Sequence, residues 1–152
     1  MKYTVRFAHL ETIPVVGIGD TISTGEHVGC MGDTGASHGN HLHIDCVHGK
    51  IQHVYHQRDI EFGVVMSAPR QLAWFIDADL FGTEILITTG YADPEYLRSE
   101  KKLHLAFDVV PENRHGTDAN FDILWNRSLP GEVIAKGFDS GYGNYIHILF
   151  EA

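Results

Sequence analysis

The sequence lacks the marks of several protein classes. No stretch approaches the ~18 consecutive apolar residues of a membrane-spanning helix, and the start, Met-Lys-Tyr-Thr-Val-Arg, has no long apolar region of a signal peptide. Basic residues are scarce as well, with 11 Lys and Arg against 20 Asp and Glu and a formal net charge of −9. Because such a charge repels phosphate backbones, we expect no nucleic-acid partner, and without an apolar span we expect no membrane partner.

Cysteine is also rare, because the chain has only Cys30 and Cys46. Their spacing matches no metal-binding motif. Cys30 alternates with Val28 on an apparent core face, and Cys46 falls on the apolar side of a predicted strand. We therefore predict that both are buried free thiols.

The 152 residues, 43% of them hydrophobic, are enough for one ordinary domain and too few for two, so we predict a single domain over 1–152. Period-two patterning and frequent glycines predict a mostly β, antiparallel fold with long loops. The apolar residues of 68–81 recur at helical spacing and predict one short helix, ending near Gly82. The predicted strands cover 3–9, 26–31, 41–47, 84–89, 104–110, 132–136 and 144–150.

The most informative stretch is His41-Leu42-His43, within Gly-Asp-Thr-Gly-Ala-Ser-His-Gly-Asn-His-Leu-His-Ile-Asp at 32–45. In a strand, residues two apart share a face, so His41, His43 and Asp45 point one way and the apolar residues between them point the other. An H-x-H alone is weak, because histidines on strands are more often surface or core groups than metal ligands.

A second segment supplies complementary groups. His104-Leu-Ala-Phe-Asp108 is an H-x-x-x-D with one imidazole nitrogen donor and one carboxylate, both accepted by zinc. The two segments together can provide His, Asp and His and leave a fourth position open. An open position distinguishes catalytic zinc from structural zinc. A third histidine, His9, lies in the apolar run Phe7-Ala-His-Leu10 and can sit beside the metal without binding it.

These motifs make the chain resemble the lysostaphin-type, LytM-like zinc endopeptidases, which cut peptides of bacterial cell walls. The resemblance implies zinc ligands at His43, His104 and Asp108, and an antiparallel β-sheet fold of the lysostaphin type. It places two catalytic histidines at His9 and His41, although spacing does not say which of them takes which part. One departure is Ala106, where the family usually has glycine.

Three further residues are candidates for supporting roles. Asp45 shares the face of the two histidines and can accept a hydrogen bond from an imidazole N–H. In the resembling family a tyrosine from the region before the H-x-x-x-D helps to hold the oxyanion. Tyr91 and Tyr96 both lie there, and the sequence does not choose between them.

The order of the motifs differs from that of the family. There the H-x-x-x-D comes first, then a strand like Tyr142-Gly-Asn-Tyr-Ile146, then the lone histidine, then the H-x-H. Joining 150–152 to 1–3 restores this order, so we infer a circular permutation. Segment 47–82 then connects the family's last strand to its first.

The resemblance implies a zinc-dependent endopeptidase that hydrolyses peptidoglycan, in the stem peptide or the cross-bridge. The alternative is a catalytically silent module that binds the wall or serves in assembly. The expected partners are peptidoglycan peptides and, in addition, a virion or carrier protein, because a wall-cutting enzyme without a signal peptide suggests a phage product. The sequence does not give the localisation of the protein. Association with a virion and release from the host cell are the two options.

Overall fold

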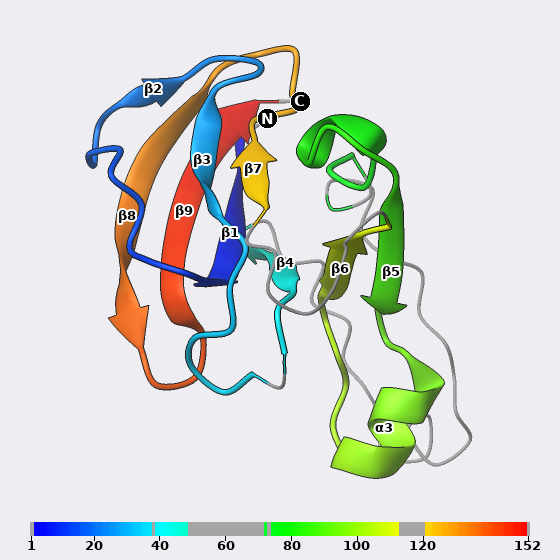
Figure 1. Ribbon diagram of the computed structural model, residues 1–152. Coiled ribbons are helices and arrows are strands. Elements are labelled where there is room, and N and C mark those ends of the chain that lie inside the picture. Colours follow the sequence, from blue (N-terminus) through cyan, green and yellow to red (C-terminus); the bar gives the residue numbers. More distant parts are fainter. Residues whose placement is uncertain (1, 38, 49–71, 73, 113–120, 152) are drawn as a thin grey trace.

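The structure, a computed structural model, describes residues 2–37, 39–48, 72, 74–112 and 121–151. Its main feature is an antiparallel sheet with strand order β2-β8-β9-β1-β4-β6-β5, accompanied by a two-stranded sheet of β3 and β7 (Figure 1). This confirms the expected mostly β fold. The strands are β1 (Lys2–Leu10), β2 (Thr21–Ile22), β3 (His27–Cys30), β4 (Leu42–His48), β5 (Ile85–Thr89), β6 (Phe107–Pro111), β7 (Asp122–Leu124), β8 (Gly131–Asp139) and β9 (Gly143–Glu151).

The expected strands coincide with observed ones to within a few residues. The exception that affects the site is the strand predicted over 104–110, because β6 begins only at Phe107. His104 therefore lies in the segment that leads into the strand. The sequence also missed β2 and β7, which are two and three residues long and too short to show an alternating pattern.

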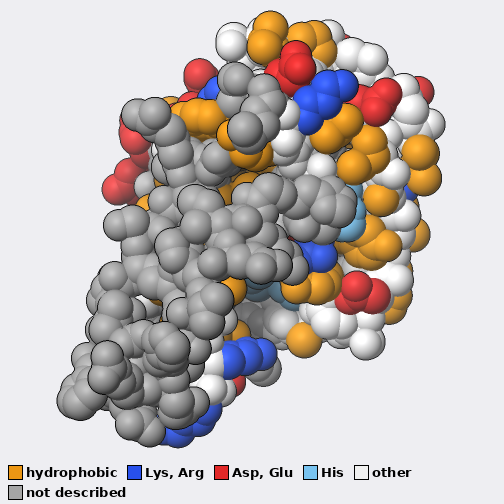
Figure 2. Space-filling view, turned by 180° about the vertical axis from the view of Figure 1, so that it is seen from behind, with side chains coloured by type: hydrophobic (Ala, Val, Ile, Leu, Met, Phe, Trp, Pro, Cys, Tyr) orange, Lys and Arg blue, Asp and Glu red, His pale blue; other side chains and the backbone are white. Residues whose placement is uncertain are grey.

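The central strands bury alternate side chains in one core. Val5 and Phe7 of β1 and Leu42 and Ile44 of β4 are fully buried. Aromatic rings fill the space above them: the Phe75 ring packs against Phe7, Trp125 and Phe150 at centroid distances of 5.8, 5.5 and 5.2 Å. Seen from behind, acidic, basic and hydrophobic side chains are interspersed over the described part of the surface (Figure 2).

The helix predicted over 68–81 lies partly outside the described residues, and its described end differs from the prediction. Residues 78–80 form a 3-10 helix, η1 (Ala78–Leu80), so no α-helix extends to Gly82. Asp77 caps η1 by accepting a hydrogen bond from the Asp79 N–H, and it also accepts one from Asn126. These side-chain hydrogen bonds compete with a continuous α-helix at this point.

The sequence missed one α-helix, α3 (Pro94–Glu100), which follows β5. Asp93 caps its first turn through the Glu95 N–H, and Pro94 occupies the first helical position. Asp-Pro-Glu is a helix-start signal that could have been recognised. Among the described residues, no helix is long and apolar enough to cross a membrane.

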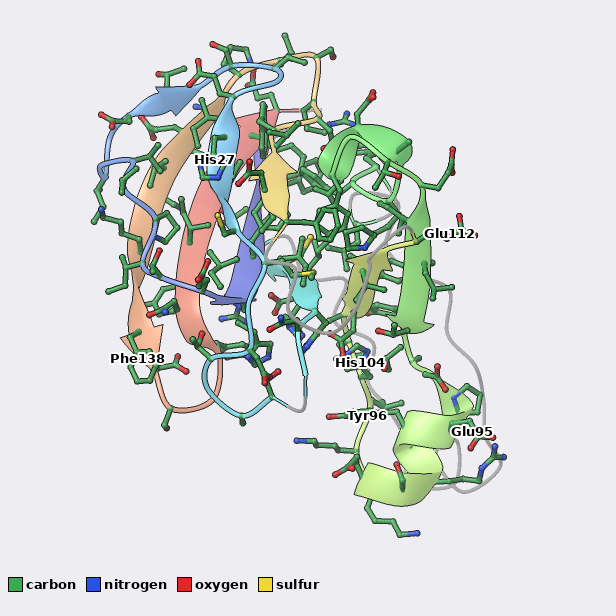
Figure 3. The ribbon with its side chains drawn as sticks, in the orientation of Figure 1. His27, Glu95, Tyr96, His104, Glu112 and Phe138 are labelled. Atoms are coloured by element: carbon green, nitrogen blue, oxygen red, sulfur yellow. The ribbon has the colours of Figure 1, made fainter. Side chains whose placement is uncertain are left out.

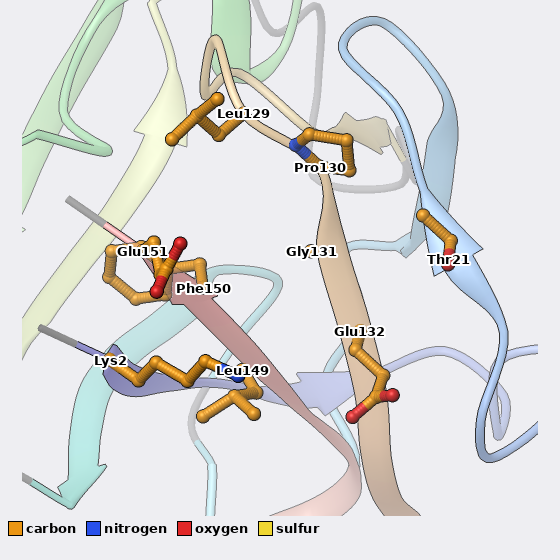
Figure 4. A pocket seen from close by; sticks show the side chains of 9 residues that line it. All are labelled: Lys2, Thr21, Leu129, Pro130, Gly131, Glu132, Leu149, Phe150 and Glu151. Atoms are coloured by element: carbon orange, nitrogen blue, oxygen red, sulfur yellow. The ribbon is translucent and has the colours of Figure 1, made fainter.

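A cavity of about 310 Å³ lies between the far ends of β8, β9 and β1, near both termini (Figure 4). None of its lining residues was a candidate site residue. They are Lys2, Thr21, Leu129, Pro130, Gly131, Glu132, Leu149, Phe150 and Glu151.

The loop after β3 touches the turn between β8 and β9 at two glycines. Gly35 and Gly143 both have positive φ, at 75° and 64°, and a Cβ on either would overlap the backbone of the other segment. The contact fixes Thr34, whose hydroxyl donates to the Leu10 carbonyl at 2.6 Å and accepts from the Asn144 N–H at 3.0 Å. Two loops far apart in sequence thus form one rigid edge beside the end of β1.

We predict that Gly143→Ala lowers the free energy of unfolding by more than Gly25→Ala does. Both positions have positive φ, which costs an L-residue roughly 1–2 kcal/mol. Only at Gly143 does the methyl group also meet backbone atoms, and such overpacking adds about 1–3 kcal/mol, whereas Gly25 faces open space. Urea unfolding of both variants measures the difference, and equal losses would refute the close approach.

Candidate active site

The sheet register brings the two predicted motifs together. β4 pairs with β6 so that His43 lies directly opposite Asp108. On the other side, β4 pairs with β1 so that Asp45 lies opposite Arg6. Because directly opposite residues share a face, one face of three adjacent strands carries a row of polar groups. This row forms the floor of the candidate site.

Three side chains in this region could hold a metal ion. His43, His104 and Asp108 each offer a ligand atom, and these atoms lie within 4.8 Å of one another. Asp108 Oδ1 lies 3.1 Å from His43 Nδ1, and Asp108 Oδ2 lies 3.2 Å from His104 Nε2. His104 sits below the start of β6, close to Tyr96 of α3 (Figure 3). They are the three residues for which the sequence predicted zinc ligation.

The surroundings of the two imidazoles fix which nitrogen faces Asp108. His104 Nδ1 donates to the Gly90 carbonyl at 3.0 Å, so Nε2 is the nitrogen left to face Asp108. In His43 the arrangement is reversed, with Nδ1 toward Asp108 and Nε2 3.6 Å from Asp45 Oδ1. His43 Nε2 is buried and has no hydrogen-bond partner among the described residues. Asp45 therefore stands behind His43, as the shared strand face predicted.

The charges at this point favour a cation. Burial disfavours the protonated imidazole of His43, but the hydrogen bond with Asp108 and the negative charges of Asp108 and Asp45 outweigh it and raise the pKa of His43 to about 9. Burial likewise opposes ionisation of Asp108, yet hydrogen bonds with His104 and His43 hold the pKa of this carboxyl well below its usual range. Positive charge is stabilised between these residues.

His9 is turned toward the site by an irregularity in β1. The pairing of β1 with β9 shifts register between Phe7 and Leu10, and His9 has a φ of 59°. Its backbone N–H donates to the Tyr142 carbonyl at 2.7 Å. Bulges of this kind re-aim a side chain, and a left-handed non-glycine residue marks a conformation that its surroundings impose. The sequence placed His9 near the metal but did not predict this backbone conformation.

Hydrogen bonds orient the rings of His9 and His41 in the same way. His9 Nδ1 donates to the Thr34 carbonyl at 2.7 Å, and His41 Nδ1 donates to the Gly39 carbonyl at 2.9 Å. In the neutral form of each ring, Nε2 is then the nitrogen that carries no proton. The ring centroids lie 4.9 Å apart, and His9 lies 5.6 Å from His43. Burial lowers the pKa of His9 despite its bond to Thr34, so His9 is neutral at pH 7.

An arginine anchors Asp45 from the opposite side. The Arg6 guanidinium forms a two-pronged ion pair with Asp45, with Nε to Oδ1 at 2.8 Å and a second bond from the terminal nitrogen to Oδ2. Its Cζ lies 3.6 Å from the centroid of the Tyr142 ring, and that ring lies 5.7 Å from His43. Tyr142 thus covers both Arg6 and His43.

The structure separates the two tyrosine candidates. The ring of Tyr96 lies 4.8 Å from the ring of His104, whereas Tyr91 packs toward Phe107 at 6.3 Å and against the core. Tyr96 is therefore the one beside His104, one of the three candidate metal ligands. Ala106 does not have positive φ, so its methyl group introduces no left-handed strain between the two ligands.

Comparison with known protein families gives a partial match. Residues 1–55 match the model of Peptidase family M23. This match, over about a third of the chain, supports a LytM-like peptidase domain. No curated protein and no solved structure matched the chain. The family indicates a metallopeptidase-type hydrolase, and the described residues include groups able to hold a metal.

The matched segment contains one side of the site. It includes His9, His41 and His43, and it ends well before His104 and Asp108. In the LytM-like domain these last two residues are tied to the matched segment by the pairing of β4 with β6. The strand pairing therefore joins the groups that the family match covers to two candidate ligands, His104 and Asp108, that lie outside it.

Sequence reasoning missed Arg6 and Tyr142 and misplaced Cys30. Arg6 occurs in an alternating strand, where an arginine is usually solvent-exposed, and only the register reveals Asp45 opposite it. Tyr142 lies in the run that carried part of the resemblance, but its contact depends on the turn between β8 and β9. Cys30 is half-buried beside Asp122 and does not lie in the core as expected, because the register of β3 shifts between His27 and Gly29.

We predict that Arg6→Met lowers the free energy of unfolding of the LytM-like domain by about 3 kcal/mol, because it leaves the nearly buried Asp45 carboxylate without its main partner. Arg98→Met is the matched control. It breaks the exposed pair of Arg98 with Glu95 and should change stability by less than about 0.5 kcal/mol. Chemical denaturation measures both, and a loss at Arg6 as small as that at Arg98 would contradict the anchoring role.

Proposed function

We propose that the LytM-like domain is a zinc-dependent endopeptidase that hydrolyses peptide bonds of bacterial peptidoglycan, in the stem peptide or the cross-bridge. The observation that supports this most is the convergence of two imidazole nitrogens and one carboxylate from separate segments, next to two further imidazoles. A metal site with a purely structural role does not need two additional imidazole rings beside its ligands. A hydrolytic site needs such groups for proton transfer.

The three residues fit zinc on several grounds. Two nitrogens and one carboxylate oxygen are a common ligand set for catalytic zinc, with one position open. The donor separations of 3.1 and 3.2 Å are of the size expected for atoms that share one ion at ~2.0–2.2 Å. The other nitrogen of each imidazole also has the usual surroundings. His104 Nδ1 donates to the Gly90 carbonyl, and the Asp45 carboxylate lies beside His43 Nε2. At zinc sites the ligating histidines commonly have a carbonyl or a carboxylate in these positions.

The chain's own residues then account for the proton transfers. His43, His104 and Asp108 would hold the zinc, which would supply Lewis-acid polarisation of the scissile carbonyl and lower the pKa of the attacking water. His9 Nε2 is unprotonated and partly shielded from solvent, so it can accept the proton of that water. His41 Nε2, on the neighbouring ring, can stabilise the developing oxyanion or deliver a proton to the leaving amine. The hydroxyl of Tyr96, whose ring lies beside His104, can donate a hydrogen bond to the developing oxyanion.

A groove next to the site suits a small-residue peptide. It has a volume of about 260 Å³ and runs between the end of β5 and α3. Hydroxyl and carboxylate groups line it, which provides hydrogen-bond partners for a peptide backbone. Its residues are Thr88, Thr89, Asp93, Glu95, Tyr96 and Ser99. We propose that the segments flanking the scissile bond, built from small residues such as glycine or D-alanine, bind along this groove.

We further propose that residues 1–152 form a single domain whose motif order is a circular permutation of the family's order. Two observations support this. β9 and β1 are adjacent and antiparallel, with Lys2 opposite Glu151, so joining their ends would give an ordinary hairpin. One core cluster also contains residues from both halves of the chain, from Val5 of β1 to Phe150 of β9.

We predict that the purified domain hydrolyses peptidoglycan or a glycyl peptide, and that a chelator abolishes this activity until zinc is restored. His43→Ala should lose activity and the zinc bound at this site. His9→Ala should lose at least 10²-fold in hydrolysis, the usual scale for a general acid or base, while it keeps about one zinc per chain at this site. Elemental analysis and product release by mass spectrometry measure the two properties.

The outcomes separate the alternatives. Retention of zinc by His43→Ala together with loss from His41→Ala would show that the assigned histidine is wrong. Zinc bound at the site with no hydrolysis of any peptidoglycan type or glycyl peptide would refute the enzyme and favour a silent module that binds wall peptides.

A further inference from the structure

A second cluster of metal-ligating groups lies on the small sheet, outside the site described above. It consists of His27 and Cys30 of β3 and Asp122 of β7, whose ligand atoms lie within 4.8 Å of one another. Asp122 Oδ1 lies 3.1 Å from His27 Nε2 and 3.3 Å from Cys30 Sγ, and the sulfur lies 3.6 Å from the same nitrogen. Figure 3 shows His27 on β3, well separated from His104.

The local backbone explains why these three groups meet. In a regular strand, residues three apart point to opposite faces, so His27 and Cys30 would not share one. The pairing of β3 with β7 shifts register between His27 and Gly29, and this irregularity brings both side chains to the same side. Cys30 is then directly opposite Asp122. The donors are held by paired strands and not by a loop.

We propose that His27, Cys30 and Asp122 form a second metal site, which binds a zinc-class divalent cation through one nitrogen, one sulfur and one oxygen. Imidazole and thiolate suit borderline and soft cations, whereas a carboxylate alone would suit calcium or magnesium. The cluster has three protein donors, and the side chains of His27 and Asp122 are 46% and 68% exposed. An ion can therefore enter from solvent and complete its coordination with water.

The thiol of Cys30 lies in negatively charged surroundings. Partial burial and the Asp122 carboxylate raise the pKa of Cys30 to about 11, and the charge of Glu11 acts in the same direction. The thiol therefore keeps its proton when no cation is present. A dication placed between the three donors replaces that proton and removes the repulsion, which is the usual exchange at thiolate metal sites.

An ion here would stabilise a weak part of the fold. The sheet of β3 and β7 has only two strands, and such pairs are marginally stable alone. An ion that bridges the two strands would hold them together. β3 leads directly into the loop that carries Thr34 and His41, so this clamp would also brace the chain that enters the candidate active site.

Thiolate absorbance distinguishes this site from the first. The donors of the first site are imidazole and carboxylate, so titration of the full chain with Cd²⁺ should produce a sulfur-to-cadmium charge-transfer band only through Cys30. In the wild type we expect a saturable band whose final amplitude corresponds to one thiolate per chain. The band should be lost in Cys30→Ser and strongly weakened in His27→Asn and Asp122→Asn. Cys46 lies on β4, where it is partly buried against the core and burial raises its pKa to about 12, so Cys46→Ser should keep the band and serves as the matched control.

The first site provides a second control, since His104→Ala should leave the band intact. A band that persists in Cys30→Ser, or that disappears only in Cys46→Ser, would overturn the proposal. So would the absence of any saturable band in wild-type protein whose folding is verified by circular dichroism. In that case the cluster would be a set of hydrogen bonds only.

Discussion

The pairing of β4 with β6 in one register is the constraint on which the rest of the site depends. It sets His43 opposite Asp108, although 65 residues separate them in the chain. A shift of one residue would turn His43 into the core and bring Leu42 to the solvent face. The full burial of Leu42 and Ile44 opposes that shift, because each would lose its apolar contacts. Core packing therefore fixes the geometry of the polar face.

Groups behind the site hold this face in place. Arg6 anchors Asp45, Asp45 faces His43, and Tyr142 covers both Arg6 and His43. On the other side, the close contact of Gly35 with Gly143 positions Thr34, whose carbonyl orients His9. The turn between β8 and β9 contributes to both supports, through Tyr142 and the adjoining Gly143. One support thus orients His43 and the other orients His9.

Much of this arrangement could be predicted from local pattern. Alternation revealed most strands, and the H-x-H and H-x-x-x-D spacings gave four candidate ligands. The family resemblance then selected the three of them that the structure brings together. What local pattern could not provide is register and backbone irregularity. The bulge at His9, the shifted pairing near Gly29 and the ion pair of Arg6 each depend on contacts between distant segments. Capping at Asp93 and Asp77 was visible in the sequence, but apolar periodicity outweighed it in the prediction of helices.

The most direct test of the account is to locate the metal in crystals of the protein grown with zinc, by anomalous diffraction at the zinc absorption edge. The account predicts a peak within ~2.0–2.2 Å of His43 Nδ1, His104 Nε2 and an Asp108 oxygen, with His9 and His41 close by but not bound. A peak coordinated by His41 in place of His43, or no peak between these residues at full zinc loading, would contradict it.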